Sequence, residues 1–304
     1  MAQLFASLPG AVSLGLIWGI MAIGVYITFK ILALSDLTVD GSICTGAAVC
    51  TMLMTAGVDP WVAMLCAVIS GGLCGLVTGL LHTVFDIPAI LAGILTQLAL
   101  WSVNLKIMGQ ANRPLSARNY PVILTQMKTE EAIFTLVLIA GAIIGLLYWF
   151  FGTELGCSIR ATGCNINMSR AQGINTEFNK VLGLVISNAL VALSGALLAQ
   201  YQGFADVNMG RGAIVIGLAA IVIGETIFSK IARNFAVRLC GVLLGGVIYY
   251  VVYQIIVFLG IDTDLLKMLS AIVVALFLGV PHIKNKIMAK IYITKRAKEA
   301  GKNA

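Results

Sequence analysis

Charged side chains are scarce in this sequence. Asp, Glu, Lys and Arg together make up 11% of its 304 residues, whereas an ordinary soluble domain has about 25%. Hydrophobic residues reach 60%, and the 32 glycines are typical of helices that approach one another closely in lipid. This composition excludes an ordinary soluble domain and predicts a membrane protein.

Residues suited to metal or redox chemistry are few and scattered. The two histidines, His82 and His282, lie far in sequence from any pair of cysteines, and no Cys-x-x-Cys pair occurs. Five of the seven cysteines fall in apolar runs, where cysteine behaves as a small hydrophobic residue. No Ser-His-Asp set and no facing pair of carboxylates is visible in the sequence. We therefore expect no metal, no cofactor and no enzymatic activity.

A nucleotide-binding loop is also absent. The chain has no Gly-x-x-x-x-Gly-Lys-Ser/Thr motif, so any ATP that drives its function must bind to another chain. No low-complexity linker, soluble segment or convincing repeat divides the sequence. The first apolar run lacks the basic segment that precedes the core of a cleaved signal peptide. We expect a single transmembrane domain over residues 1–304.

Basic residues concentrate at the end of the chain. The net charge is +7, but residues 284–302 alone carry seven basic residues and one acid, which leaves the remainder nearly neutral at +1. This distribution argues against nucleic-acid binding. A basic tail beside a membrane helix is typical of a cytoplasmic anchor that faces anionic lipid. We interpret residues 284–304 in this way.

Nine stretches without a charged residue predict an all-α, polytopic membrane protein. A helix needs about 20 residues to cross the hydrocarbon core, and six of the nine reach or nearly reach that length. The shortest, 212–224, is interpreted as a full span that its neighbours extend. The nine stretches are 1–29, 41–58, 60–85, 87–105, 132–153, 181–205, 212–224, 239–261 and 268–283.

The distribution of basic residues between these stretches predicts an orientation. Nine spans with a cytoplasmic tail place the N-terminus outside. In that arrangement fourteen basic residues lie inside and six lie outside, as expected because cytoplasmic loops carry an excess of Lys and Arg. We therefore expect a multi-pass protein of the bacterial inner membrane with a cytoplasmic C-terminus.

A polar stretch at residues 152–175 separates two long apolar runs. It is too long for a minimal connection between helices. Asn165 is a good N-cap, and Gly173 tolerates the left-handed conformation that closes a helix. The residues between them form two helical turns, which are too short to be stable alone in water. We predict a short helix that another molecule stabilises by docking.

The same stretch resembles a loop in the permeases of bacterial ABC importers for ribose-like sugars and branched-chain amino acids. The resemblance continues through residues 193–197 and, more loosely, through residues 34–41. Within this group the sequence is most similar to permeases for amino acids, of the tryptophan or tyrosine type. The matching positions in the polar stretch are Gly156, Arg160, Ala161, Gly163, Asn165, Ala171, Gly173, Ile174 and Asn175.

This resemblance implies a function and a set of partners. The chain would be the transmembrane subunit of an importer that pairs with a second copy of itself, binds two cytoplasmic ATPases and receives solute from an external binding protein. The polar loop of such permeases carries a coupling helix that sits in a groove of the ATPase. Here the helix would comprise Asn165, Ile166, Asn167, Met168, Ser169, Arg170, Ala171, Gln172 and Gly173.

Two acids flank the break between the first two apolar stretches. Asp40 precedes Gly41, where its carboxylate is suited to cap the helix that begins there, and Asp36 would do something similar or face water. The alternative is that they contact the solute, because an ionisable residue near membrane depth is a functional candidate. Either interpretation predicts a broken or half-helix at this point.

Other polar residues within the apolar stretches are candidates for a solute pathway. Gln97, Trp101 and Asn104 follow a spacing of i, i+4 and i+7, so they share one face of a helix. They either line a pathway or hydrogen-bond to neighbouring helices, and Asn188 has the same two interpretations. A competing class is an ion-coupled carrier that works without an ATPase, which would depend on Asp36, Asp40 or Glu225.

Overall fold

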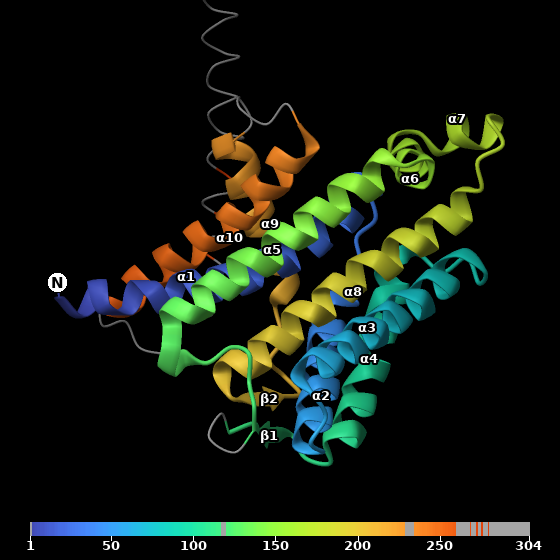
Figure 1. Ribbon diagram of the computed structural model, residues 1–304. Helices are drawn as coiled ribbons and strands as arrows, with labels where there is room; N and C mark the ends of the chain where they lie inside the picture. Colours follow the sequence, from blue (N-terminus) through green and yellow to red (C-terminus); the bar gives the residue numbers. More distant parts are fainter. Residues whose placement is uncertain are drawn as a thin grey trace, which may run out of the picture.

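The computed structural model of the chain describes residues 2–116, 120–228 and 234–259, together with positions 268, 272, 275 and 279. The described part is nearly all helical, as predicted (Figure 1). Its helices are α1 (Ala2–Tyr26), α2 (Val39–Thr55), α3 (Pro60–Thr83), α4 (Ala89–Met108), α5 (Thr129–Gly152), α6 (Glu154–Cys164), α7 (Ile166–Ala171), α8 (Thr176–Gln202), α9 (Ala213–Phe228) and α10 (Phe235–Phe258), with a π-helical turn η1 (Ile27–Ile31) and a 3₁₀ turn η2 (Gln126–Lys128).

Six helical segments are long and apolar enough to cross a membrane in the described part of the chain. They are α1 with η1, α3, α4, α5 with η2, α8 and α10. Two shorter apolar helices, α2 and α9, correspond to the predicted stretches 41–58 and 212–224. The predicted stretch 268–283 lies outside the described residues apart from four single positions. A total of nine spans therefore stays a prediction.

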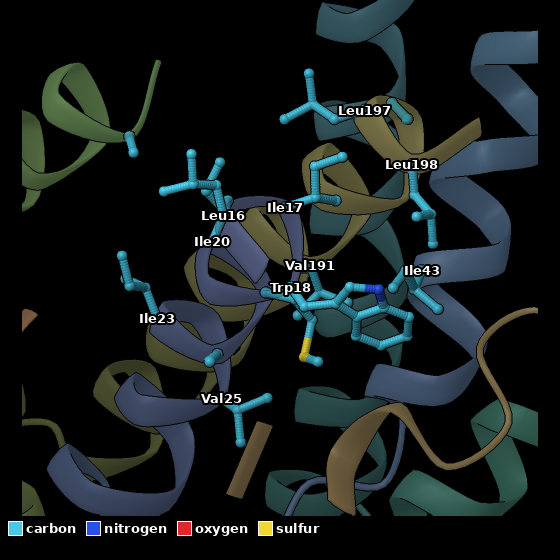
Figure 2. Close-up of a cluster of buried hydrophobic side chains, with 14 of the residues drawn as sticks. Leu16, Ile17, Trp18, Ile20, Ile23, Val25, Ile43, Val191, Leu197 and Leu198 are labelled. Atoms are coloured by element: carbon cyan, nitrogen blue, oxygen red, sulfur yellow. The ribbon is translucent and has the colours of Figure 1, made fainter. Parts of the chain in front are cut away.

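Helix α1 lies at the centre of the bundle, in contact with α5, α8, α9 and α10. Its apolar side chains from Leu16 to Val25 are buried against Val191, Leu197 and Leu198 of α8 and Ile43 of α2 (Figure 2). This helix is apolar on all sides, which is typical of a helix surrounded by protein rather than by water.

Helix α8 packs between α3 and α1 through small residues and hydroxyl groups. Gly71 and Gly75 of α3 lie so close to α8 that a Cβ at either position would collide with the α8 backbone. On the other side, Ser187 Oγ donates to the Gly24 carbonyl at 2.7 Å and Ser194 Oγ to the Ile17 carbonyl at 2.8 Å, both on α1. Close backbone approach and interhelical hydrogen bonds are the usual means by which helices associate in lipid.

Helices α2 and α9 are shorter than a membrane-spanning helix. Their 17 and 16 residues correspond to about 25 Å each at 1.5 Å per residue, against a hydrocarbon core of about 30 Å. Extended or turn segments precede both helices, at 32–38 and 207–212. The sequence predicted that α2 begins at Gly41; it begins at Val39 instead, so Asp40 lies inside its first turn and does not cap it.

The two ends of the bundle carry different connections (Figure 1). At one end, β1 (Asn112–Pro114) pairs antiparallel with β2 (Phe204–Asp206), an addition to the predicted all-α fold. At the other end lie α6 and α7. Lys30, Arg160 and Arg238, which the sequence assigns to the cytoplasmic side, line one pocket at this second end. These three residues therefore share one end of the bundle, and the orientation itself stays a prediction.

Candidate functional site: the α6–α7 hairpin and a polar pocket

The polar stretch forms two short helices rather than one. α6 begins after Thr153, whose hydroxyl accepts from the Gly156 N–H at 3.4 Å, and ends at Cys164. This helix was not predicted from the sequence. The available signal was Thr153 itself, because Thr is a favourable N-cap residue.

Helix α7 has the caps that the sequence predicts. The Asn165 Oδ1 atom accepts from the Met168 N–H at 3.0 Å. At the other end Gly173 has a φ of +78°, and the Ile174 N–H donates to the Ser169 carbonyl at 3.1 Å, which is the closing bond of a Schellman motif. Both ends of α7 are therefore capped, and this helix projects from the end of the bundle (Figure 1).

Most of the predicted contact residues on this helix point outward. Met168 is the most exposed large apolar residue among them, with 59% of its surface exposed. Ser169 is the exception, since it is only 3% exposed and donates from Oγ to the Asn165 carbonyl at 3.0 Å. The exposed members are Asn165, Ile166, Asn167, Met168, Arg170, Ala171, Gln172 and Gly173. We call these eight residues the α7 surface.

Arg170 and Arg160 make different contacts. Arg170 Nε donates to Thr176 Oγ1 at 3.1 Å, and its guanidinium lies 3.9 Å from Glu177, which ties α7 to the start of α8. Arg160 donates to the Phe151 carbonyl at 2.8 Å and so ties α6 to the end of α5. Both side chains therefore fix the pair of helices α6 and α7, which we call the α6–α7 hairpin. Arg170 nevertheless remains exposed enough to meet a partner.

The hairpin is packed directly on the bundle. A Cβ at Gly163 of α6 would collide with the carbonyl oxygen of Ile31, the last residue of η1. From α8, Asn179 Nδ2 donates to Thr162 Oγ1 at 2.9 Å. Turn η1 in turn contacts α9, because Lys30 Nζ lies 2.8 Å from the Glu225 carboxylate. A continuous set of contacts therefore joins the hairpin to η1 and then to α9.

Asp40 caps a helix, but not the predicted one. Its two carboxylate oxygens accept from the N–H groups of Gly212 at 2.9 Å and Ile214 at 3.0 Å, at the start of α9. The carboxylate also lies where the positive end of that helix dipole favours a negative charge. The prediction of a capping role was therefore right about the chemistry and wrong about the helix.

This assignment leads to a stability prediction. Asp40→Leu would leave two N–H groups of α9 without an acceptor, and losing an N-cap costs about 0.5–2 kcal/mol. Asp40→Asn should lose less stability than Asp40→Leu, because its amide oxygen still accepts from one of the two N–H groups. Thermal unfolding of the purified variants would measure the difference. Equal melting temperatures for the Leu and Asn variants would contradict the capping role.

Asp36 and Asn188 form a buried pair near the middle of the bundle. Asp36 is 3% exposed and accepts from the Thr38 N–H at 2.9 Å and from Asn188 Nδ2 at 2.8 Å. Asn188 Oδ1 accepts from Ser42 Oγ at 2.6 Å. These bonds join the segment before α2, α2 itself and α8. Asn188 therefore makes the interhelical bonds that were one of its two predicted roles, and Asp36 does not face water.

The remaining predicted pathway residues meet at one pocket. Asp40 of α2 and Gln97, Trp101 and Asn104 of α4 line a cavity of about 180 Å³, together with Arg211 from the turn before α9. The three residues on the common face of α4 thus lie on one wall of this cavity, and a role in the solute pathway stays a prediction. Arg211 was not predicted there, since the sequence shows it only as a basic residue between two glycines.

The helical bundle with six apolar segments of spanning length defines a multi-pass membrane protein. The chain belongs to the family described as branched-chain amino acid transport system / permease component, whose sequence model matches residues 8–280. It is therefore a transporter component rather than an enzyme.

Two relatives illustrate the range of this similarity. The tyrosine transport system permease protein of Clostridioides difficile (strain R20291) is 41% identical over 268 residues, which are 88% of this chain and 89% of the relative. The D-allose transport system permease protein AlsC of Escherichia coli (strain K12) is 27% identical over 217 residues, or 70% of this chain and 65% of the relative. These relatives confirm the resemblance found in the sequence.

A solved structure shares the fold. A chain of PsaBC from Streptococcus pneumoniae, in complex with Fab, matches with a TM-score of 0.53 and 16% identity, over 92% of this chain and 94% of that chain. At this identity the match shows the fold alone.

Proposed function

We propose that this chain is the transmembrane permease subunit of an ATP-driven ABC importer that passes a small solute, an amino acid, from an external binding protein to the cytoplasm. The observation that carries the proposal is the α7 surface, which is exposed, capped at both ends and fixed to the bundle through α6. The name of the tyrosine permease relative supports an amino acid as the solute. ATP hydrolysis would take place on a separate chain.

The contacts of the hairpin support a route for coupling. An ATPase that moves α7 would also move α6, which has no room to slide against Ile31 because Gly163 meets that carbonyl directly. The displacement would reach α9 through the pair of Lys30 and Glu225. Interfaces this closely packed shift between discrete arrangements rather than deform gradually.

The charged groups of the pocket support the position of the solute pathway. Asp40 is partly exposed and Arg211 is exposed, yet Asp40 lies on the first turn of α2, beside the buried pair near the middle of the bundle. A charged side chain at that depth faces water or protein, not lipid. We therefore place the pathway along this face, with a second copy of the permease across it and one ATPase under each copy.

The ion-coupled alternative has less support. Both oxygens of Asp40 accept from the backbone of α9, and both oxygens of Asp36 are hydrogen-bonded. A carboxylate that binds or releases a coupling ion would have to break these bonds in each cycle. The test of the proposed function is uptake by vesicles that contain the permease with and without its ATPase.

The proposed orientation gives a topology prediction. With the α6–α7 hairpin in the cytoplasm and β1–β2 outside, Gln110→Cys and Asn167→Cys should react with a membrane-impermeant maleimide from opposite sides, in a background without native cysteines. Sealed right-side-out and inside-out vesicles of the inner membrane would separate the two. Labelling of both cysteines from the same side would contradict the orientation.

A further inference from the structure

The charged side chain of Arg211 makes no contact with the described residues that would explain it as a structural residue of the fold. In the described part of the chain its guanidinium has no ion pair and no hydrogen-bond acceptor, and the side chain lines the cavity between α2, α4 and the start of α9. The backbone on either side of it is fixed, because Asp40 holds Gly212 and the Cys44 Sγ atom accepts from the Gly210 N–H at 3.2 Å. A fixed backbone thus holds an unpaired cation at the wall of a cavity.

A second polar atom at this cavity, the Oδ1 atom of Asn104, lacks a hydrogen-bond partner among the described residues. Asn104 is 0% exposed, and its Nδ2 atom donates to the Gly41 carbonyl at 3.4 Å. Its Oδ1 atom is buried and accepts no hydrogen bond from the described residues. A buried acceptor without a donor costs about 1–3 kcal/mol of stability, so its presence beside a cavity suggests that a ligand supplies the donor.

Trp101 completes the wall with an aromatic surface. It is 44% exposed and lies one helical turn from both Gln97 and Asn104 on α4. Indole rings are partners both for other aromatic rings and for cations. The cavity of about 180 Å³ suits a small solute rather than a sugar oligomer or peptide.

We propose that this cavity is a contact site for the transported solute and that it selects an aromatic α-amino acid. The Arg211 guanidinium would bind the α-carboxylate, the Asn104 Oδ1 atom would accept from the α-ammonium, and Trp101 would pack against the side-chain ring. This inference rests on the proposed function, since it makes the cavity part of the permeation pathway. Asp40 acts here by positioning Arg211 through its bond to Gly212.

Protection from chemical labelling tests the site without ATP or any partner. Gln97 lies on the cavity wall, so a single Gln97→Cys in a full-length permease in lipid nanodiscs reports its occupancy. The seven native cysteines are replaced by serine in this permease, so that the side chain at position 44 still offers an acceptor to the Gly210 N–H. A small water-soluble methanethiosulfonate should label this cysteine about threefold more slowly when L-phenylalanine is present at twice its dissociation constant. L-Alanine should protect less, and D-ribose should not protect.

Two pairs of variants make the result specific. Arg211→Gln should abolish protection, whereas Arg113→Gln, which removes a charge on β1, should leave it unchanged. Trp101→Leu should remove the preference for L-phenylalanine over L-alanine, whereas Trp149→Leu, at an exposed position of α5, should keep it. The proposal is overturned if L-phenylalanine gives no protection, if D-ribose protects equally, or if Arg211→Gln keeps full protection.

This measurement separates the two proposals. Protection without ATP-driven uptake would reject the importer and keep the binding site. ATP-driven uptake by the wild-type permease, together with unprotected labelling, would keep the importer and reject the site.

Discussion

Met168→Glu is expected to reduce ATP-driven uptake by about tenfold or more while the permease still inserts and folds. Met168 is the most exposed large apolar residue of the α7 surface, and methionine adapts well to a groove on a partner. A carboxylate in the same groove would lose its water without gaining a partner, which costs several kcal/mol, and about 1.4 kcal/mol already corresponds to a tenfold change in affinity. Uptake by vesicles that contain permease, ATPase and binding protein measures the effect.

Met168→Leu is the matched control for this substitution. Leucine keeps the apolar side chain, so uptake should stay within about twofold of the wild type, as volume-conserving apolar exchanges are usually tolerated. Size-exclusion chromatography of both variants checks that the protein is folded. Wild-type uptake by a folded Met168→Glu permease would reject the α7 surface as the ATPase contact.

Gly163→Ala is expected to destabilise the junction between the hairpin and the bundle. The added methyl group would meet the backbone carbonyl of Ile31, which cannot rotate away as a side chain can. Overpacking of this kind costs about 1–3 kcal/mol and sometimes more. We expect a lower melting temperature and, because α6 links α7 to η1, weaker coupling of ATP hydrolysis to uptake.

Gly145→Ala provides the comparison. Gly145 lies in α5, and a Cβ at this position would meet nothing within 4 Å. The same change should therefore be neutral or raise the stability by up to about 1 kcal/mol, since alanine favours the helix. Equal melting temperatures for the two variants would mean that α6 does not pack on Ile31 as described.

Local features of the site were predictable from the sequence because their causes are local. The Asn165 side chain caps the adjacent helix by accepting from an N–H group three residues later, and Gly173 closes that helix through its own backbone conformation. The shared face of Gln97, Trp101 and Asn104 likewise follows from the period of one helix. Patterns of this range need no knowledge of the neighbouring elements.

Features that depend on distant segments were not predictable in the same way. Asp40 looked like the cap of the helix next to it in sequence, but its partners lie about 170 residues later at the start of α9. In the sequence Arg211 is only a basic residue between two glycines, and the turn at 207–212 brings it beside α4. Helix α6 was missed because its buried face, Gly156, Ile159 and Thr162, has only one large apolar side chain, and its stability comes from packing on η1 and α8.

ATP-dependent uptake in a defined system tests the central claim most directly. The permease would be reconstituted into vesicles with its cognate ATPase and binding protein, and uptake of L-tyrosine would be compared with and without ATP. The account predicts uptake only when both ATP and the ATPase are present, and loss of this uptake in Met168→Glu. Equal uptake by vesicles that contain the permease alone and an ion gradient would contradict it.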